Sequence, residues 1–497
     1  MIEQLDSTDE FDICIIGGGA TGLGTALDAA SRRFKTILFE QHDFAKGTSS
    51  RSTKLVHGGV RYLQQGNIKL VMEALRERGM LMKNAPHLVH NQKFVVPNYK
   101  WWEKPFYGIG LKIYDKMAGN LGLGPSQFLS KEEILQLAPT LDPEDLRGGV
   151  LYHDGQFDDA RLAISIAQTA SQHSAVLLNY FPVTGLLKIQ KKICGIRVKD
   201  FFTGKEYEVK SKVVINATGV FSDAIMKMDD GKHENIISPS QGIHLVVDKE
   251  FLPGDTAIMI PRTDDGRVLF AVPWHDKIVL GTTDTAVDTV SAEPIPLQEE
   301  IEFILKHIGR YLSKDPQLSD VRSMFAGLRP LVKGKTKKTA ALSRDHLIDI
   351  GESGLITITG GKWTTYRKMA EDVVDIAIKQ SALPQSSCVT NDLKLYGHDR
   401  PVGPAEIISL NNDELKALIK NSVEEEMCMT VEDFLSRRTR QLLLNAHEAI
   451  KAAPLVAKLM AEEMNKDENW INEQINIFNV VTKNYAPTSN LQHQTLN

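Results

Sequence analysis

The sequence predicts a mixed α/β (α+β) fold. It would have a two-dinucleotide-binding-type Rossmann domain, an interleaved antiparallel-sheet domain and a small C-terminal helical domain. Three observations predict it: a strand–glycine–helix unit at residues 11–40, an antiparallel pattern from residue 236 to about 332, and helical periodicity after residue 404. The expected boundaries are 10–95, 150–235 and 340–380 for the Rossmann part, 95–150 and 236–340 for the substrate part, 381–403 for a linker and 404–497 for the helical domain.

The first unit has the order that a dinucleotide site requires. An apolar strand at residues 13–16 leads into Gly17, Gly19 and Gly22, and an Ala-rich helix and a second strand follow before Glu40. These glycines permit a tight turn, close approach of a pyrophosphate and close helix–strand packing. The free N–H groups of the helix start face the phosphates, and an acid about 18 residues beyond Gly22 can bind ribose hydroxyls. The alternative is a merely tight strand–helix turn.

Composition limits the class of protein. A net charge of -5 gives no reason to expect nucleic acid as a partner. The four cysteines are scattered without a C-x-x-C pair, which argues against a zinc site or a disulfide framework, and no metal site is predicted. The N-terminus lacks the regions of a signal peptide, and no apolar run approaches the ~20 residues that span a bilayer. We therefore expect a cytoplasmic protein that could still lie on a membrane surface.

Two segments leave alternatives open. Residues 41–62 are rich in Gly, Ser, Thr and basic residues, which suits either a loop along a phosphate-bearing cofactor or a solvated surface loop. Residues 101–111 combine Trp101, Trp102, Phe106 and Tyr107 with lysines. This pattern fits either a membrane interface or an aromatic cluster buried under a loop. Asp158 or Asp159 is expected to cap the helix that follows rather than to act in catalysis.

Two later segments repeat the geometry of a strand that ends in a small-residue turn. An apolar strand at 213–215 runs into the turn 216–219, and a β-branched strand at 355–359 runs into Gly360 and Gly361. A helix from Thr364 would direct its positive dipole end at an electron-rich ligand atom. Beyond the linker, four helices are expected at 413–421, 430–446, 455–464 and 470–482, with Arg437 and Arg438 on the polar side of the second.

Four basic residues lie in apolar or glycine-rich surroundings. They are Arg61, Arg329, Arg344 and Lys362. Any one of them alone would be interpreted as a surface ion pair, but four that flank the predicted cofactor loops favour a small anionic substrate, because arginine matches phosphate or carboxylate geometry.

The motifs GGGATG, TSSRSTKLVHGGVRYL, DGQFDDARL, INATG, GTTD, AGLRPL, SRDH, GGKWTTYRKMAED and VEDFLSRRTR occur in this order. Together they closely resemble the FAD-dependent glycerol-3-phosphate dehydrogenases over about the whole chain. The resemblance implies FAD as cofactor and oxidation of sn-glycerol 3-phosphate to dihydroxyacetone phosphate. It also implies a peripheral position on the inner face of the cell membrane, a membrane quinone as electron acceptor and a possible homodimer. The C-terminal helical part looks shorter than the family pattern between residues 401 and 430.

The resemblance also implies residue roles. The residues that would bind FAD are Gly17, Gly19, Gly22, Glu40, Thr48, Ser49, Lys54, His57, Ala217, Gly219, Gly361, Lys362, Thr364 and Thr365. Those that would surround the substrate are Arg61, Tyr62, His244, Arg329, Arg344 and Lys362. Of these, His244, Arg329 and Lys362 are the expected catalytic residues.

In the implied reaction a base takes the C2 hydroxyl proton while hydride leaves C2 for flavin N5, and cations hold the phosphate. His244 is the candidate base; the alternative is a histidine bonded within the sheet. Three other proteins would share the fold: a glycerol-3-phosphate oxidase that uses oxygen, an amine or amino-acid oxidase, and a non-catalytic FAD-binding redox sensor. The inserted segment of the oxidases is not seen, and the phosphate-binding cations argue against the other two.

Overall fold

The computed structural model describes residues 1–59, 67–261, 263–333, 346–400 and 402–487. Its first sheet is built around β1 (Phe11–Ile16), which pairs in parallel with β2 (Thr36–Phe39) and β10 (Glu206–Asn216). The order is β17-β18-β10-β1-β2-β7, completed by β7 (Val176–Leu178), β18 (Ile356–Gly360) and the antiparallel β17 (His346–Ile350). An antiparallel pair, β8 (Val183–Ile189) and β9 (Lys192–Lys199), continues from β10.

Both faces of this sheet are covered, which explains why β1 is apolar throughout its last four residues. On one face, Ile13 and Ile15 pack with α2 (Ala20–Ser31), α7 (Asp159–Gln172) and α10 (Tyr366–Gln380). On the other, Cys14 and Ile16 pack with β8–β10 and with Ile225 of α8 (Ser222–Asp229). A short helix, α1 (Ile2–Ser7), contributes Leu5 to this second core.

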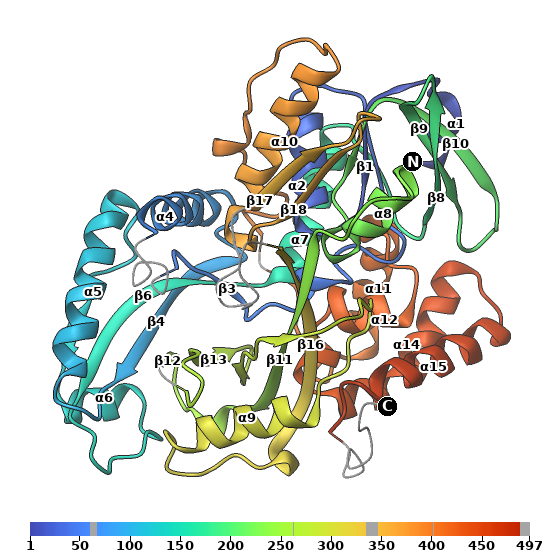
Figure 1. The fold of residues 1–497 in the computed structure, drawn as a ribbon. Coiled ribbons are helices and arrows are strands. Elements are labelled where there is room, and N and C mark those ends of the chain that lie inside the picture. Colours follow the sequence, from blue (N-terminus) through green and yellow to red (C-terminus); the bar gives the residue numbers. More distant parts are fainter. Residues whose placement is uncertain (60–66, 262, 334–345, 401, 488–497) are drawn as a thin grey trace.

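The second sheet has the order β15-β11-β14-β13-β12-β4-β6-β3, with β16 beside β11 and β5 beside β6 (Figure 1). Its strands are β3 (Leu55–Val56), β4 (Val89–Pro97), β5 (Gln127–Leu129), β6 (Gly149–Phe157), β11 (Ile237–Asp248), β12 (Thr256–Ile260), β13 (Leu269–Trp274), β14 (Lys277–Gly281), β15 (Thr285–Ala286) and β16 (Val321–Val332). Four helices flank it: α4 (Ile68–Asn84), α5 (Glu103–Ala118), α6 (Lys131–Leu137) and α9 (Gln298–Gly309).

The C-terminal helices pack on this second sheet. They are α11 (Asn412–Glu426), α12 (Val431–Asp433), α13 (Gln441–Leu444), α14 (Ala446–Met464) and α15 (Glu468–Thr482). Their shared core includes Val246, Val279 and Phe325 from the strands. No helix in the described ranges is both long and apolar enough to cross a bilayer.

Three expectations are corrected. The boundaries at 95 and 150 are misplaced, because β4 and β6 pair with each other within the second sheet. Residues 103–118 form a helix, with Leu111 and Tyr114 buried and Ile109 and Ile113 exposed, so they are not a cluster buried under a loop. Residues 430–446 are not one helix with a polar side: Phe434–Arg438 is a π-helical turn whose two arginines are buried.

Candidate functional site

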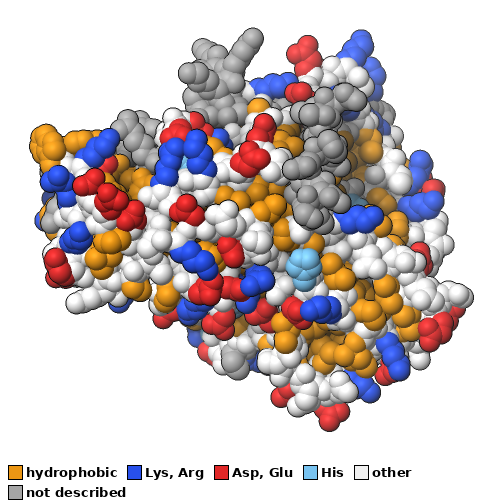
Figure 2. Space-filling model, turned by 90° about the horizontal axis from the view of Figure 1, so that it is seen from below, with side chains coloured by type: hydrophobic (Ala, Val, Ile, Leu, Met, Phe, Trp, Pro, Cys, Tyr) orange, Lys and Arg blue, Asp and Glu red, His pale blue; other side chains and the backbone are white. Residues whose placement is uncertain are grey.

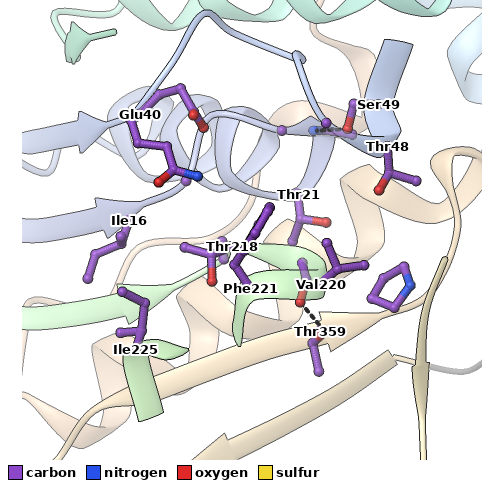
Figure 3. A pocket seen from close by; sticks show the side chains of 18 of the residues that line it. Ile16, Thr21, Glu40, Thr48, Ser49, Thr218, Val220, Phe221, Ile225 and Thr359 are labelled. Atoms are coloured by element: carbon purple, nitrogen blue, oxygen red, sulfur yellow. Dashed lines mark hydrogen bonds between the residues drawn. The ribbon is translucent and has the colours of Figure 1, made fainter. Parts of the chain in front are cut away.

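A cavity of about 350 Å³ lies at the carboxyl ends of β1, β2, β10 and β18. Ligands of open parallel sheets bind at this edge. Of the residues predicted for the cofactor, those that line the cavity are Gly17, Gly19, Glu40, Thr48, Ser49, Ala217, Gly219, Gly361 and Lys362. Figure 3 shows side chains from β1, from the loop after β2 and from the segment after β10 around this space. The fold therefore brings residues from 16–49, 217–228 and 358–363 together around one site.

The glycines of the first turn are fixed by close backbone contacts. Gly17 has a φ of +109°, and an added Cβ would lie 2.7 Å from the Ala217 carbonyl oxygen. A Cβ on Gly22 would lie 1.8 Å from the Gly17 carbonyl oxygen. Gly19 is the N-cap of α2, and the Ala20 N–H donates to Ser49 Oγ at 2.9 Å. The start of α2 thus faces the cavity with little side-chain bulk in the way.

Glu40 is held in place by its own backbone surroundings. Its Oε2 accepts from the Gly18 N–H at 2.6 Å and its Oε1 from the His42 N–H at 2.9 Å. Burial raises the pKa of this carboxyl, and the two N–H donors oppose that shift. The acid is therefore positioned at the end of β2, as the sequence predicted.

The far end of the cavity is formed by the turn after β18. Thr359 Oγ1 donates to the Gly219 carbonyl at 3.2 Å (Figure 3). The next two glycines both have positive φ, +79° and +70°, which redirects the chain past the cavity. The indole N–H of Trp363 donates to the Ser49 carbonyl at 2.8 Å. Thr364 and Thr365 follow and are buried behind this wall.

A second cavity, of about 220 Å³, lies next to the first and is bordered by strands of the second sheet, by α5 and by residues 53–59. It is lined by Thr53, His57, Tyr107, Tyr152, Arg267, Arg329 and the 282–284 turn, among others. The two cavities are neighbours, since Pro330 lines the first and Arg329 the second.

Arg329 reaches this second cavity from β16. Its Nη2 donates to the Thr283 carbonyl at 2.9 Å and to Thr282 Oγ1 at 3.1 Å, and its Nη1 lies 3.6 Å from Asp284 Oδ1. These contacts fix the plane of the guanidinium at the cavity wall. A planar, fixed guanidinium suits bidentate binding of a phosphate or carboxylate.

His244 lies one layer behind the second cavity. Its side chain is 2% exposed, and its Nε2 is hydrogen-bonded to Thr53 Oγ1 at 2.9 Å. The ring stacks on Phe325 with centroids 4.9 Å apart. Burial lowers the pKa of His244 well below its usual range, and Lys54 and Arg329 lower it further. The imidazole is therefore neutral, with Thr53 between it and the cavity.

Lys54 is placed differently from the expectation that it lines the cofactor. Its ammonium is fully buried in an ion pair with Asp159, 2.7 Å from Oδ1, and it is absent from the described linings of both cavities. Asp158 alone caps α7, by accepting from the Arg161 N–H. Arg61, Tyr62 and Arg344 lie outside the described residues.

Thr53 and Arg267 are two of the residues that line the second cavity without having been predicted as site residues. Thr53 stands within the SRSTK segment, and Arg267 follows the turn at residues 264–266. Arg267 Nη1 is buried and has no hydrogen-bond partner among the described residues. A buried unpaired donor at a cavity wall is a ready anion contact.

Comparisons with known proteins agree with this geometry. A family profile described as FAD dependent oxidoreductase matches residues 12–367, and one described as C-terminal domain of alpha-glycerophosphate oxidase matches residues 396–470. The human mitochondrial glycerol-3-phosphate dehydrogenase is 41% identical over 95% of this chain and 73% of its own length. A mitochondrial glycerol-3-phosphate dehydrogenase of Arabidopsis thaliana is 45% identical over 79% of this chain and 64% of its own length.

The chain belongs to the FAD-dependent glycerol-3-phosphate dehydrogenases. A crystal structure of the Bacillus halodurans glycerol-3-phosphate dehydrogenase complexed with FAD has a TM-score of 0.79, 30% identity and coverage of 98% of this chain and 97% of that one. The glycerophosphate oxidase of Mycoplasma pneumoniae, at 19% identity and a TM-score of 0.60, shares the fold.

FAD is therefore the cofactor of this oxidoreductase. The first cavity fits it, because a glycine cradle, a helix N-terminus and a fixed carboxylate all border it. These features suit a pyrophosphate and a ribose in turn.

Proposed function

We propose that this dehydrogenase oxidises sn-glycerol 3-phosphate to dihydroxyacetone phosphate and passes the electrons to a membrane quinone. The observation that carries the substrate assignment is the fixed Arg329 guanidinium in a small cavity that adjoins the cofactor cavity. Arg267 also lines this cavity; its Nε and Nη2 pair with Asp265, which leaves Nη1 to contact an anion. Two cations in a space of about 220 Å³ suit a three-carbon phosphate rather than a large anion.

Position in the first cavity supports most of the roles proposed at the cofactor. Gly17, Gly19 and Gly22 would admit the pyrophosphate, Glu40 would bind the ribose, and Thr48, Ser49, Ala217 and Gly219 would line the central part. Gly361 and Lys362 would face the flavin, with Thr364 and Thr365 behind them and His57 on the substrate side. When bound, FAD supplies the two-electron acceptor for the C2 hydrogen.

The proton of the C2 hydroxyl needs a path, and His244 is the proposed base. It is neutral and can accept a proton, but its ring lies behind the Thr53 hydroxyl. We therefore assign Thr53 as the group that touches the substrate hydroxyl and hands the proton to His244 Nε2. Arg329 would stabilise the negative charge that develops on the C2 oxygen.

An exposed apolar surface supports contact with a membrane, where a quinone would reside. Trp101, Ile109, Ile113 and Phe128 are 78%, 60%, 48% and 42% exposed, and Lys112 Nζ lies 5.0 Å from the Phe128 ring centroid. Figure 2 shows hydrophobic and basic side chains together at the left end of the molecule, where Figure 1 places α5. Exposed apolar side chains with a lysine beside them suit an anionic lipid surface on the inner face of the membrane.

An anaerobic flavin spectrum tests the substrate. The purified holoenzyme should lose absorbance near 450 nm when sn-glycerol 3-phosphate is added, and D-lactate, which lacks a phosphate, should leave the spectrum unchanged. Rapid reoxidation on admission of air, with peroxide formed, would favour the oxidase instead. Absorbance that stays constant with glycerol 3-phosphate would rule out this substrate.

Vesicle sedimentation tests the membrane surface. The wild-type protein should sediment with vesicles that contain phosphatidylglycerol. The double variant Ile109→Glu/Ile113→Glu should bind at least about 10-fold more weakly, since it lacks two apolar side chains that would enter the membrane. Ile189→Glu is the matched control, because Ile189 is 67% exposed on the β8–β9 pair, away from α5. Equal loss in the control would contradict the assignment of α5.

A further inference from the structure

A buried group of charged residues joins the C-terminal domain to the loop after β2. We call it the Asp43 cluster; it consists of Asp43, Glu432, Asp433, Arg437 and Arg438. Side chains of all five are at most 8% exposed. Such residues are rarely buried unless they are paired, so their partners decide what the cluster does.

The two arginines converge on one carboxylate. Arg438 Nη1 lies 2.6 Å from Asp43 Oδ2, and its Nη2 lies 2.8 Å from Oδ1, which makes a bidentate pair. Arg437 Nε donates to the same Oδ2 at 2.5 Å, while its Nη2 donates to Asp433 Oδ1 at 2.8 Å. Burial alone would raise the pKa of Asp43, but Arg438 and Arg437 outweigh it and lower the pKa to about 2.

The π-helical turn Phe434–Arg438 explains how two consecutive arginines reach one acceptor. The Thr439 N–H bonds back to the Phe434 carbonyl at 2.8 Å, which is the wider spacing of a π-turn. Arg438 Nη2 also donates to the Glu426 carbonyl at 2.6 Å, the last residue of α11. Contacts within the C-terminal domain, with Asp433 and the Glu426 carbonyl, therefore orient both arginines toward Asp43.

Asp43 lies within the loop that lines the first cavity. His42, Ala45, Lys46 and Gly47 all line that cavity. The Lys46 N–H donates to the Asp43 carbonyl at 3.2 Å, and the Lys46 ammonium lies 2.6 Å from Glu432 Oε2. The 42–47 loop is thus bound to the C-terminal domain through Asp43 and Lys46, while the loop also lines the cofactor cavity.

We propose that the Asp43 cluster is a positioning device for FAD, through which the C-terminal domain fixes the 42–47 loop in the conformation that binds the cofactor. This inference rests on FAD occupying the first cavity. Arg437 and Arg438 are positioning residues that act through Asp43. Without them the loop would spend only part of its time in the binding conformation, and the apparent Kd for FAD would rise in inverse proportion to that fraction.

The test is a titration of the Arg438→Gln apo-protein with FAD, in which binding is measured by the quenching of flavin fluorescence. We expect the Kd for FAD to rise at least about 10-fold, as for a loop that is correctly placed about 10% of the time. The double variant Asp43→Asn/Arg438→Gln should bind no more weakly than the single variants, because the pair acts as a unit. If the double variant instead showed the sum of the two single-variant losses in binding free energy, that result would contradict the coupling.

Arg440→Gln is the matched control. Arg440 belongs to the same segment and is equally buried, but its Nε pairs with Asp158 Oδ2 at 2.9 Å, at the cap of α7. The Arg440→Gln variant should lower the thermal stability of the apo-protein about as much as Arg438→Gln does. Its Kd for FAD should stay within about 3-fold of the wild-type value. An equal rise of Kd in both variants, or none in Arg438→Gln, would overturn the proposal.

Glu432→Gln provides a milder variant if Arg438→Gln does not fold. It removes the charge that holds Lys46 without touching the cavity lining, and we expect a rise in the FAD Kd of about 3-fold or more. An unchanged Kd here would also overturn the proposal. FAD binding is measured without substrate, so failure of the substrate assignment would appear only in the flavin-bleaching experiment.

Discussion

Arg329 shows how one residue combines charge with fixed geometry. Lysine would keep the charge but lose the fork that is now oriented by Thr282 and Thr283. We expect Arg329→Lys to lower kcat/KM for glycerol 3-phosphate by about 10- to 100-fold, from the loss of ~1.5–3 kcal/mol of charged hydrogen bonding. Steady-state kinetics would measure this. Arg322→Lys, on the same strand but paired with Asp248 at the surface, should stay within about 2-fold.

A single residue, His42, should also make the stability of the apo-protein depend on pH. Burial, with the nearby Lys46 ammonium, lowers the pKa of His42 to about 4, from 6.5. The unfolded chain therefore takes up a proton as the pH falls below 6.5, whereas the folded protein does not until about pH 4. We expect apo-protein stability to fall between these values by about 1–3 kcal/mol. His42→Gln should flatten this part of a urea-unfolding series, and an unchanged slope would contradict the assignment.

At the scale of elements, the β1–α2 turn leaves no room for side chains. A Cβ on Gly22 would lie 1.8 Å from a backbone oxygen, which cannot rotate away. We expect Gly22→Ala to cost about 1–3 kcal/mol of stability and to abolish measurable FAD binding, because the first helical turn must move away from β1. Gly110→Ala is the control, since Gly110 also lies in a helix but has nothing within 4 Å of its added Cβ. Its stability should be unchanged or slightly higher by thermal unfolding.

At the scale of the whole molecule, the Asp43 cluster and the shared core at Phe325 connect all three parts of the chain. We therefore expect one cooperative unfolding transition. Saturation with FAD at about 100 times its Kd should add ~2.7 kcal/mol of stability and raise the Tm of that single transition. Differential scanning calorimetry would measure it. Two transitions, of which FAD moved only one, would show that the C-terminal domain unfolds independently.

The sequence by itself determined the site wherever the signal was local. Strand, glycines, helix and Glu40 all fall within 30 residues, and the turn at Gly360 and Gly361 is equally compact, so pattern and turn chemistry were enough to place them. The family motifs added the substrate class, which periodicity does not encode.

Only the tertiary structure decided which polar residues are buried. Arg437 and Arg438 have the pattern of a solvated helix face, yet their partner Asp43 lies 394 and 395 residues away in the sequence. The same holds for Lys54, which pairs with Asp159 rather than lining the cofactor, and for Thr53, which separates His244 from the cavity. A charge is stable in the interior only when a partner compensates its desolvation, and the identity of that partner is a property of the folded chain.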